Sequence, residues 1–279
     1  MKIEKADKTG FCFGVRRAVE VLEKVAQERG SVETLGAVVH NKQVMQRLAT
    51  IGVKVARDMD DIRGGTVATS SHGISPQVEK ELRSRDIGII STTCPFVHRA
   101  QVAARRLAEA GFFVVIYGDA NHPEVKGILG WTKGQGIATM DEKFLETLAQ
   151  VPRRLGILSQ TTQIPAHFNE FAKRLIDAAL SRDSEIRIID TICHDIRQRQ
   201  AAALKLAKKV DLMLVVGGHH SANTNLLAEL CAEVTETHVV ETAEEIIPSW
   251  LRGKNRVGIT AGASTDEQTV DEVWRKLNG

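Results

Sequence analysis

Three of the chain's four cysteines stand at matching places in the sequence. Cys12, Cys94 and Cys193 each follow an extended segment and directly precede a stretch whose apolar residues recur with helical spacing. A cysteine at the start of a helix lies near unpaired backbone N–H groups and the positive end of the helix dipole, which favour the thiolate. Thiolates are metal ligands, and several of them stay close together only around a cation. We therefore expect these three residues to bind one metal centre if the fold brings them together.

Two kinds of centre suit three thiolates. One is a zinc ion with an open fourth position, and the other is an iron–sulfur cluster in which one iron lacks a protein ligand. The fourth cysteine, Cys231, is spaced with Leu227, Leu230 and Val234 as one face of a helix, so we expect it to be a core residue. A structural zinc ion would need a fourth protein ligand, which favours iron but leaves zinc open.

Polar residues come after the strands that the sequence predicts. The same number of residues leads from each of the three cysteines to a polar residue, namely His40, His122 or Ser221. Histidine rings, hydroxyl groups and amides suit an anionic ligand such as a phosphate. The residues expected to bind such an anion are His40, His72, His122, Ser221, Asn223 and Ser264.

A carboxylate and two threonines offer proton chemistry. Glu124 lies two residues after His122, and it could donate a proton if burial raises its pKa. The alternative is that Glu124 only stabilises the first turn of a helix. Thr161 and Thr162 follow another predicted strand, where they could assist proton transfer or cap a helix.

The cysteines belong to a repeat of strands and helices. Strands that alternate with helices predict an α/β fold with small parallel sheets. We expect three related units at residues 13–93, 94–190 and 191–279, with a strand at 1–6 completing the third sheet. In the first unit the β-type run after the cysteine helix is expected over residues 34–40. Loops at the carboxyl ends of parallel strands form binding crevices, so three units around one pseudo-threefold axis would create a central site.

Composition argues against two classes of partner. Lys and Arg number 37 against 35 Asp and Glu, so the basic stripe typical of a nucleic-acid-binding protein is not expected. The apolar runs are far shorter than a membrane span, and the first residues have no apolar segment of the signal-peptide type. We therefore expect a cytoplasmic protein that binds neither nucleic acid nor membrane.

Nine segments together resemble the 4-hydroxy-3-methylbut-2-enyl diphosphate reductase family. The resemblance implies a cloverleaf of three α/β units around a [4Fe–4S] cluster in which one iron lacks a protein ligand. It also implies that the cluster is held by Cys12, Cys94 and Cys193, that Glu124 donates protons, and that Thr161 assists, with Thr162 as the second choice. The diphosphate would be held by His40, His72, His122, Ser221, Asn223 and Ser264. The segments are GFCFGVRRAV, LGAVVHN, SSHGIS, TTCPFV, NHPEVKG, SQTT, DTIC, GGHHSANT and ITAGAST.

The reaction implied by the resemblance is a reductive removal of an allylic hydroxyl group with two electrons and two protons. Its products would be isopentenyl and dimethylallyl diphosphate. No GxGxxG dinucleotide motif occurs, so the electrons are expected from an external one-electron donor protein of the ferredoxin or flavodoxin type. Two positions depart from the family pattern: Ala222 replaces a second serine, and Asn121 replaces a frequent glycine.

Two other functions fit the same residues. One is a zinc-dependent hydrolase in which the three cysteines hold zinc and Glu124 activates water. The other is a non-catalytic sensor of small anions that carries an iron–sulfur cluster. Metal analysis separates the first from the reductase, and turnover of the diphosphate substrate separates the second.

Overall fold

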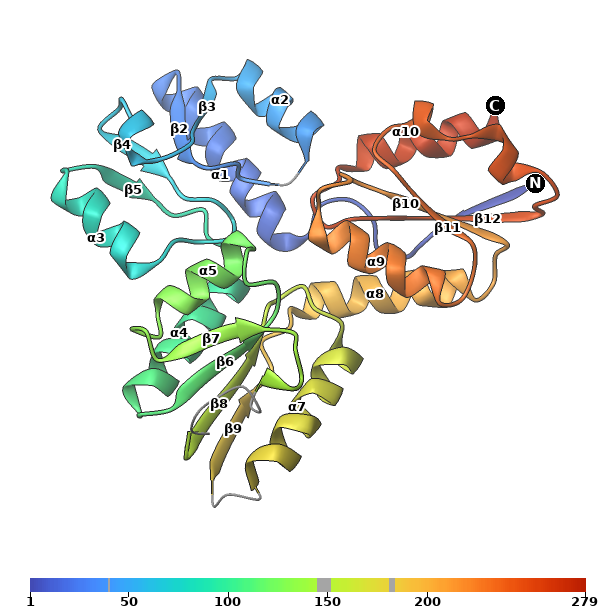
Figure 1. The fold of residues 1–279 in the computed structure, drawn as a ribbon. Coiled ribbons are helices and arrows are strands. Elements are labelled where there is room, and N and C mark those ends of the chain that lie inside the picture. Colours follow the sequence, from blue (N-terminus) through green and yellow to red (C-terminus); the bar gives the residue numbers. More distant parts are fainter. Residues whose placement is uncertain (40, 145–151, 181–183) are drawn as a thin grey trace. The chain divides into compact units, whose positions relative to one another are not determined.

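The computed structural model describes residues 1–39, 41–144, 152–180 and 184–279 (Figure 1). These residues form three four-stranded sheets in which all neighbouring strands are parallel. Helices connect the strands, which confirms the α/β class predicted from their alternation.

The described residues divide into two compact units. Unit 1 comprises residues 1–23, 39–52 and 194–279, and unit 2 comprises residues 24–38 and 53–193. Unit 1 contains one of the sheets, and unit 2 contains the other two. The division into three repeats at 13–93, 94–190 and 191–279 stays a prediction.

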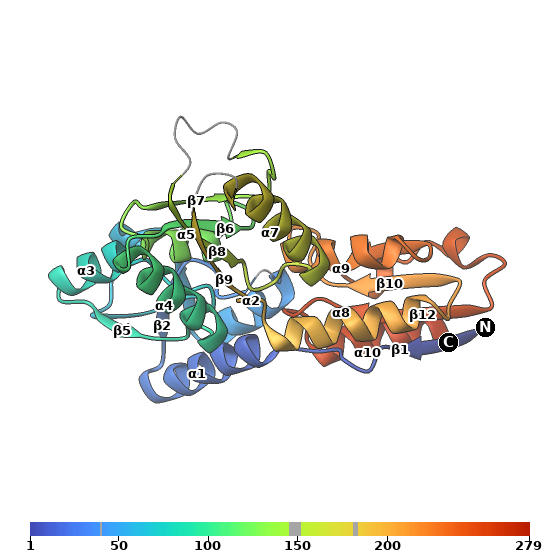
Figure 2. The ribbon, with the colours of Figure 1, turned by 90° about the horizontal axis from the view of Figure 1, so that it is seen from below.

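The sheet of unit 1 has the order β1-β12-β10-β11. The amino-terminal strand β1 pairs with β12, as expected for residues 1–6. Helix α10 packs on one face through Val270 and Val273, and helices α8 and α9 pack on the other through Ala203 and Leu227 (Figure 1). Both chain ends belong to this unit and lie side by side in two views (Figures 1 and 2). The bounds are β1 (Lys2–Lys5), β10 (Leu212–Val216), β11 (Thr237–Val240), β12 (Arg256–Ala261), α2 (Lys42–Thr50), α8 (His194–Ala207), α9 (Ala222–Ala232) and α10 (Glu267–Asn278), with 3₁₀ turns η2 (Ala243–Glu245) and η3 (Pro248–Leu251).

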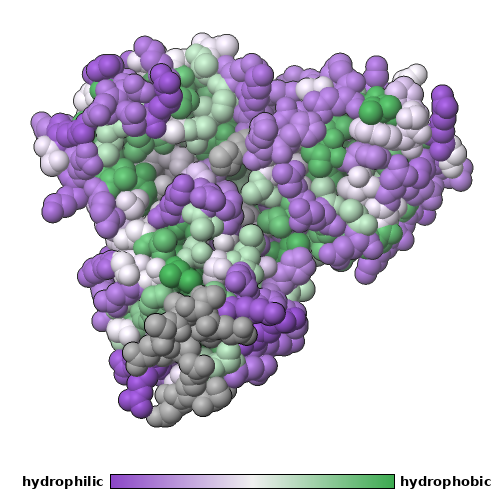
Figure 3. Space-filling model, in the orientation of Figure 1, coloured by the Kyte–Doolittle hydropathy of each residue, from purple (hydrophilic) through white to green (hydrophobic). Residues whose placement is uncertain are grey.

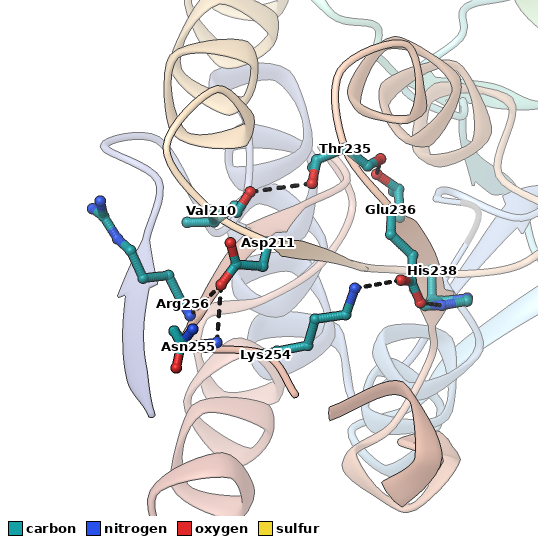
Figure 4. A network of polar contacts seen from close by, with 9 residues as sticks. Val210, Asp211, Thr235, Glu236, His238, Lys254, Asn255 and Arg256 are labelled. Carbon is teal, nitrogen blue, oxygen red and sulfur yellow. Dashed lines mark hydrogen bonds and ion pairs between the residues drawn. The ribbon is translucent and has the colours of Figure 1, made fainter. Parts of the chain in front are cut away.

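A network of polar contacts connects the loops at the amino-terminal ends of the strands of this sheet (Figure 4). Asp211 precedes β10, and its Oδ2 accepts hydrogen bonds from the backbone N–H groups of Asn255 and Arg256, each at 2.9 Å. Nearby, the ammonium group of Lys254 pairs with the carboxylate of Glu236. These contacts hold the strands in register at the end opposite to the one where the sequence predicts chemistry.

The second sheet has the order β7-β6-β8-β9 and lies in unit 2. Its two central strands, β6 and β8, are buried on both faces, which is typical of parallel sheets. Phe168 and Phe171 of α7 pack on one face, while Ala104 and Leu107 of α4 and Ile128 of α5 pack on the other. The bounds are β6 (Phe113–Tyr117), β7 (Gly136–Thr139), β8 (Arg154–Ser159), β9 (Glu185–Ile189), α4 (Pro95–Glu109), α5 (Pro123–Gly130) and α7 (Pro165–Leu180).

The third sheet, β3-β2-β4-β5, corrects one expectation. The strand expected over 34–40 is β2, and it ends at Leu35. Gly36 follows in the left-handed region with a φ of 75°, so the chain turns there. Val38 and Val39 are buried although they lie outside the strand, which explains why their apolar character was misleading. The bounds are β2 (Val32–Leu35), β3 (Val53–Ala56), β4 (Thr66–Ala68), β5 (Gly88–Ile90), α3 (Pro76–Ser84) and the 3₁₀ turn η1 (Met59–Asp61).

Each of the three matched cysteines directly precedes a helix, as predicted. Helix α1 (Phe13–Arg29) follows Cys12, α4 follows Cys94 and α8 follows Cys193. Cys231 lies in α9 with no solvent exposure, which confirms that it is a core residue. Val234 was wrongly assigned to the same buried face, because α9 ends at Ala232 and Val234 is 41% exposed.

The surface in Figure 3 is mostly hydrophilic, and its hydrophobic side chains form small separate patches. Among the described residues, no helix combines the length and the apolar character that crossing a bilayer requires.

Candidate functional site

Glu124 is the most deeply buried of the predicted site residues that the structure describes. It lies in the first turn of α5 and is 2% exposed. Its carboxylate accepts two hydrogen bonds from Thr161, which follows β8: the backbone N–H lies 2.7 Å from Oε1, and the hydroxyl lies 2.9 Å from Oε2. One residue of unit 2 thus holds both oxygens of the carboxylate. By contrast, the hydroxyl of Thr162 is buried and has no hydrogen-bond partner among the described residues.

Burial raises the pKa of Glu124 above the ordinary value of a glutamate, because desolvation disfavours the charged carboxylate. The backbone and hydroxyl hydrogen bonds from Thr161 act in the opposite direction, and they are the smaller influence. A carboxyl group of this kind can hold a proton at a higher pH than an exposed glutamate, which is what a general acid needs.

His122 is the N-cap of α5. Its Nδ1 accepts a hydrogen bond from the backbone N–H of Glu124 at 3.1 Å. In the neutral ring the proton therefore lies on Nε2, and this nitrogen is a hydrogen-bond donor. The ring of His72 lies edge-on to that of His122, with 5.2 Å between the ring centroids and 88° between the planes. The two imidazoles thus lie together in unit 2.

The two cysteines of unit 2 are fixed by backbone contacts with this group. The N–H of Cys193 donates to the carbonyl of Thr161 at 2.9 Å, and the N–H of Cys94 donates to the carbonyl of Ser71, the neighbour of His72, at 3.0 Å. A continuous path of contacts within unit 2 therefore joins six of the predicted residues. They are Cys94, His72, His122, Glu124, Thr161 and Cys193.

Cys12 lies in unit 1 beside the loop that follows β12. Its N–H donates to the carbonyl of Ala263 at 2.9 Å, so the cysteine lies next to Ser264. Its sulfur accepts a hydrogen bond from the N–H of Val15 at 3.5 Å, in the first turn of α1. This is the interaction with unpaired helix N–H groups that favours a thiolate.

Ser221 and Asn223 lie where α9 begins, after β10. The hydroxyl of Ser221 caps the helix by accepting from the N–H of Thr224 at 3.3 Å, which leaves its proton available to a ligand. The amide nitrogen of Asn223 is buried without a hydrogen-bond partner among the described residues. A donor in that state is costly unless a ligand satisfies it. Thr265 ties the neighbouring loop to the end of β10 by donating to the carbonyl of Val216 at 3.0 Å.

The two departures from the family pattern have different structural settings. Asn121 lies in a turn, where its N–H donates to Oδ1 of Asp119 at 2.9 Å. In the described part of the chain, non-glycine residues with a positive φ occur only at Asp86 and Lys133, so the turn at Asn121 does not require glycine. Ala222 is the first residue of α9 and offers only its backbone to a ligand.

The structure brings the predicted residues together in two groups. Unit 2 holds the six residues named above, and unit 1 holds Cys12, Ser221, Asn223 and Ser264. His40 lies outside the described residues. Within the described residues, no three or more His, Cys, Asp or Glu side chains are grouped so as to hold a metal ion. The meeting of the three cysteines therefore stays a prediction.

The donor set itself fits an iron–sulfur cluster. None of the four cysteines is in a disulfide, and three of them begin helices, where thiolates are favoured. Three thiolates leave one coordination position for another ligand. The residues that would hold the cluster are Cys12, Cys94 and Cys193.

Sequence reasoning missed one buried residue in this region, Arg199 of α8. It is 2% exposed, and its guanidinium donates hydrogen bonds to the carbonyls of Gly10 and Ala261. A signal was available, because Arg199 shares its helix face with Ile196 and Ala203, which are both apolar and buried. A charged residue on the buried face of a helix is unusual without a partner.

Comparison with known proteins places the whole chain in one group. The model of the family described as LytB protein matches residues 3–278. The chain is 61% identical over 278 residues to the 4-hydroxy-3-methylbut-2-enyl diphosphate reductase of Dehalococcoides mccartyi strain CBDB1, covering 100% of this chain and 98% of that protein. It is 42% identical to the protein of the same name from Geobacter metallireducens, covering 99% of this chain and 97% of that protein.

Two solved structures of similar proteins agree with this. One is the E-1-hydroxy-2-methyl-but-2-enyl-4-diphosphate reductase of Plasmodium falciparum, with a TM-score of 0.94 and 25% identity over 100% of this chain and 88% of that one. The other is an (E)-4-hydroxy-3-methyl-but-2-enyl diphosphate reductase described as the terminal enzyme of the non-mevalonate pathway. It has a TM-score of 0.72 and 38% identity over 100% of this chain and 99% of that one.

Proposed function

This chain belongs to the LytB family, and from that premise we propose that it removes the allylic hydroxyl group of 4-hydroxy-3-methylbut-2-enyl diphosphate. The reaction consumes two electrons and two protons, releases water, and gives isopentenyl and dimethylallyl diphosphate. Members of the family are iron–sulfur enzymes. The observation that carries the proposal is the buried carboxyl group of Glu124, held by Thr161 in unit 2.

Proton delivery is the role of Glu124. Its buried carboxyl group has a raised pKa, so it can hold a proton until the substrate needs one. The hydroxyl group of Thr161 lies 2.9 Å from Oε2 and assists by fixing the orientation of the carboxyl group and relaying the proton. The N–H of Cys193 is bonded to the carbonyl of Thr161, which supports proton delivery close to a cluster ligand.

Binding of the diphosphate is the role of short donors at strand ends and helix starts. Nε2 of His122 and the unpartnered amide of Asn223 suit this role because each can donate a hydrogen bond to a phosphate oxygen. The N-termini of α5 and α9 add a favourable field for an anion. The residues proposed to hold the diphosphate are His40, His72, His122, Ser221, Asn223 and Ser264.

We infer that Cys12, Cys94 and Cys193 hold a [4Fe–4S] cluster in which one iron lacks a protein ligand. When bound, such a cluster would pass electrons from a donor to the substrate and offer an open coordination position. The thiolates that hold it are favoured by the helix starts at which all three cysteines lie. The electrons are supplied by a separate one-electron donor protein of the ferredoxin or flavodoxin type, since the sequence has no dinucleotide-binding motif.

The test uses protein purified without oxygen. Iron, sulfide and zinc are measured per chain, and turnover of the diphosphate substrate is followed with a chemical reductant. We expect about four iron and four sulfide ions per chain, together with formation of both five-carbon diphosphates. A colourless protein with one zinc ion and no iron would contradict the proposal and indicate a zinc enzyme. An intact cluster without product would indicate a sensor of small anions.

A further inference from the structure

Arg199 occupies an unusual place for a charged residue. It lies in the middle of α8 and is 2% exposed, among the apolar side chains that pack this helix against the sheet of unit 1. Burying a guanidinium is costly unless its donors and its charge are compensated. The contacts that compensate Arg199 therefore show what the residue does.

Both ends of its guanidinium fork bind main-chain carbonyl groups. Nη1 donates to the carbonyl of Ala261 at 3.0 Å, and Nη2 donates to that of Gly10 at 2.8 Å. Ala261 is the last residue of β12, and Gly10 lies two residues before Cys12. One side chain thus links the end of a strand to the segment that carries a proposed cluster ligand.

A second contact fixes the same segment two residues further along the chain. The N–H of Cys12 donates to the carbonyl of Ala263 at 2.9 Å, in the loop after β12. Gly10 itself is in the left-handed region with a φ of 73°, and a side chain there would lie 2.6 Å from Cγ of Glu267. The segment before Cys12 is therefore a tight turn, and Arg199 and Ala263 hold it at two points.

The charge of Arg199 also lies close to the segment of Cys12, because its Nη2 bonds to the carbonyl of Gly10, two residues before that cysteine. Desolvation lowers the pKa of Arg199, and the negative charges of Cys12 and Asp195 oppose this effect. A guanidinium stays protonated in proteins, so a positive charge is buried against the segment that carries Cys12. The Nε of Arg199 has no hydrogen-bond partner among the described residues, so one of its donors stays unsatisfied there.

We propose that Arg199 is a positioning residue for the metal centre: its fork holds the turn before Cys12 against the end of β12, and its buried charge favours the reduced, more negative state of the bound cluster. This inference rests on the proposed function. It assigns a role to a residue that is not among those proposed to bind the substrate or to deliver protons.

Two variants separate position from charge. Arg199→Met keeps an apolar stem of similar length but removes both donors and the charge. Arg199→Lys keeps the charge but loses the planar fork that bonds two carbonyls at once. Lys205→Met is the matched control, because Lys205 is an exposed residue of the same helix, paired with Asp7 at 3.1 Å.

Two measurements are made on each protein, purified without oxygen. The first is hydrogen exchange at the amide of Cys12, which we expect to be about tenfold faster in both Arg199 variants. The second is the midpoint potential of the cluster. Loss of the buried cation in Arg199→Met should make the equilibrium constant for reduction of the cluster tenfold smaller. The midpoint potential should therefore fall by about 59 mV. Arg199→Lys should keep the wild-type midpoint potential, but its Cys12 amide should exchange faster. Lys205→Met should change neither the exchange rate nor the potential.

Three outcomes overturn the inference. In the first, Arg199→Met has the same exchange rate and the same midpoint potential as Lys205→Met. In the second, the Cys12 amide of Arg199→Lys exchanges at the wild-type rate. In the third, the midpoint potential of Arg199→Lys is lowered. If Arg199→Met is insoluble, the lysine variant decides by itself through the last two results. Absence of any cluster from the wild-type protein refutes the proposed function instead, and hydrogen exchange still tests the positioning role.

Discussion

At the scale of single residues, burial decides which groups can do proton chemistry. Glu124 is 2% exposed, and both of its carboxylate oxygens are bonded to Thr161. The sequence left two roles open for Glu124, and the structure is compatible with both, because the residue also lies in the first turn of α5. A residue that served only to stabilise the helix would gain nothing from burial, since the helix dipole acts on exposed carboxylates as well.

We expect Glu124→Gln to retain the cluster and the affinity for substrate but to lower kcat about 10²-fold, the usual contribution of a general acid. In the wild type, activity should fall as the pH rises through the pKa of Glu124, because the acid must be protonated and its pKa is raised by burial. This descending limb should be absent from the variant. The measurement is the pH dependence of kcat, with the exposed Glu109→Gln as the control. Unchanged kcat in Glu124→Gln would remove this residue from the mechanism.

Cys231 is the residue with which the roles of the other cysteines are compared. It is completely buried in α9, and desolvation raises the pKa of its thiol to about 12. We expect Cys231→Ala to keep its iron and its activity and to lower the free energy of unfolding by about 1 kcal/mol, through a small cavity. Denaturant unfolding and iron analysis measure the two effects. Loss of iron from this variant would assign Cys231 to the metal centre.

At the scale of elements, periodicity predicted most of the fold. The helices after the cysteines agree with the sequence, because their apolar residues recur with helical spacing. The pairing of β1 with β12 also agrees, because the amino-terminal strand was expected to complete the third sheet. The prediction of a strand over 34–40 was wrong beyond Leu35, because Gly36 adopts a left-handed conformation and ends β2. Val38 and Val39 are buried by tertiary contacts that no local pattern reveals.

The amino-terminal edge of the unit 1 sheet carries a prediction of its own. Hydrogen bonds from the N–H groups of Arg256 and Asn255 lower the pKa of Asp211. Its ionised form therefore stabilises the fold at pH values above the pKa of the unfolded chain, and this contribution is lost as the pH falls through the lower folded pKa. We expect Asp211→Ala to lower Tm at neutral pH, by a difference that shrinks in acid. Thermal unfolding from neutral pH to about pH 2 measures this. Glu229→Ala, an exposed change in α9, should show a smaller effect; a Tm difference for Asp211→Ala that is independent of pH would contradict the prediction.

At the scale of the whole molecule, the candidate site is assembled from residues far apart in the chain. Matched positions in the repeat allowed the cysteines and many of the strand-end donors to be named from the sequence. The contacts among them could not be named, because the link from Thr161 to Glu124 and the fork of Arg199 depend on tertiary packing. The helix face of Arg199 gave a signal that it is buried, but only the structure shows the two carbonyl groups that its guanidinium binds.

The decisive prediction concerns the three cysteines as one set. Cys12 belongs to unit 1, whereas Cys94 and Cys193 belong to unit 2. If they are the protein ligands of one cluster, replacing any one of them by serine should have the same result, because a cluster that loses one of three thiolates is no longer held. We expect each single variant to retain little iron or sulfide and no reductase activity, although its secondary structure by circular dichroism stays that of the wild type.

The measurement is iron and sulfide per chain after anaerobic purification, with Cys231→Ala as the matched control. Equal losses in the three variants and full retention in the control would support a shared centre. A variant of Cys12 that kept a full cluster, while those of Cys94 and Cys193 lost theirs, would mean that the two units do not share the centre. The residues of unit 1 proposed to bind the diphosphate would then not share one site with Glu124 of unit 2. The proposed reductase mechanism, which needs both, would be refuted.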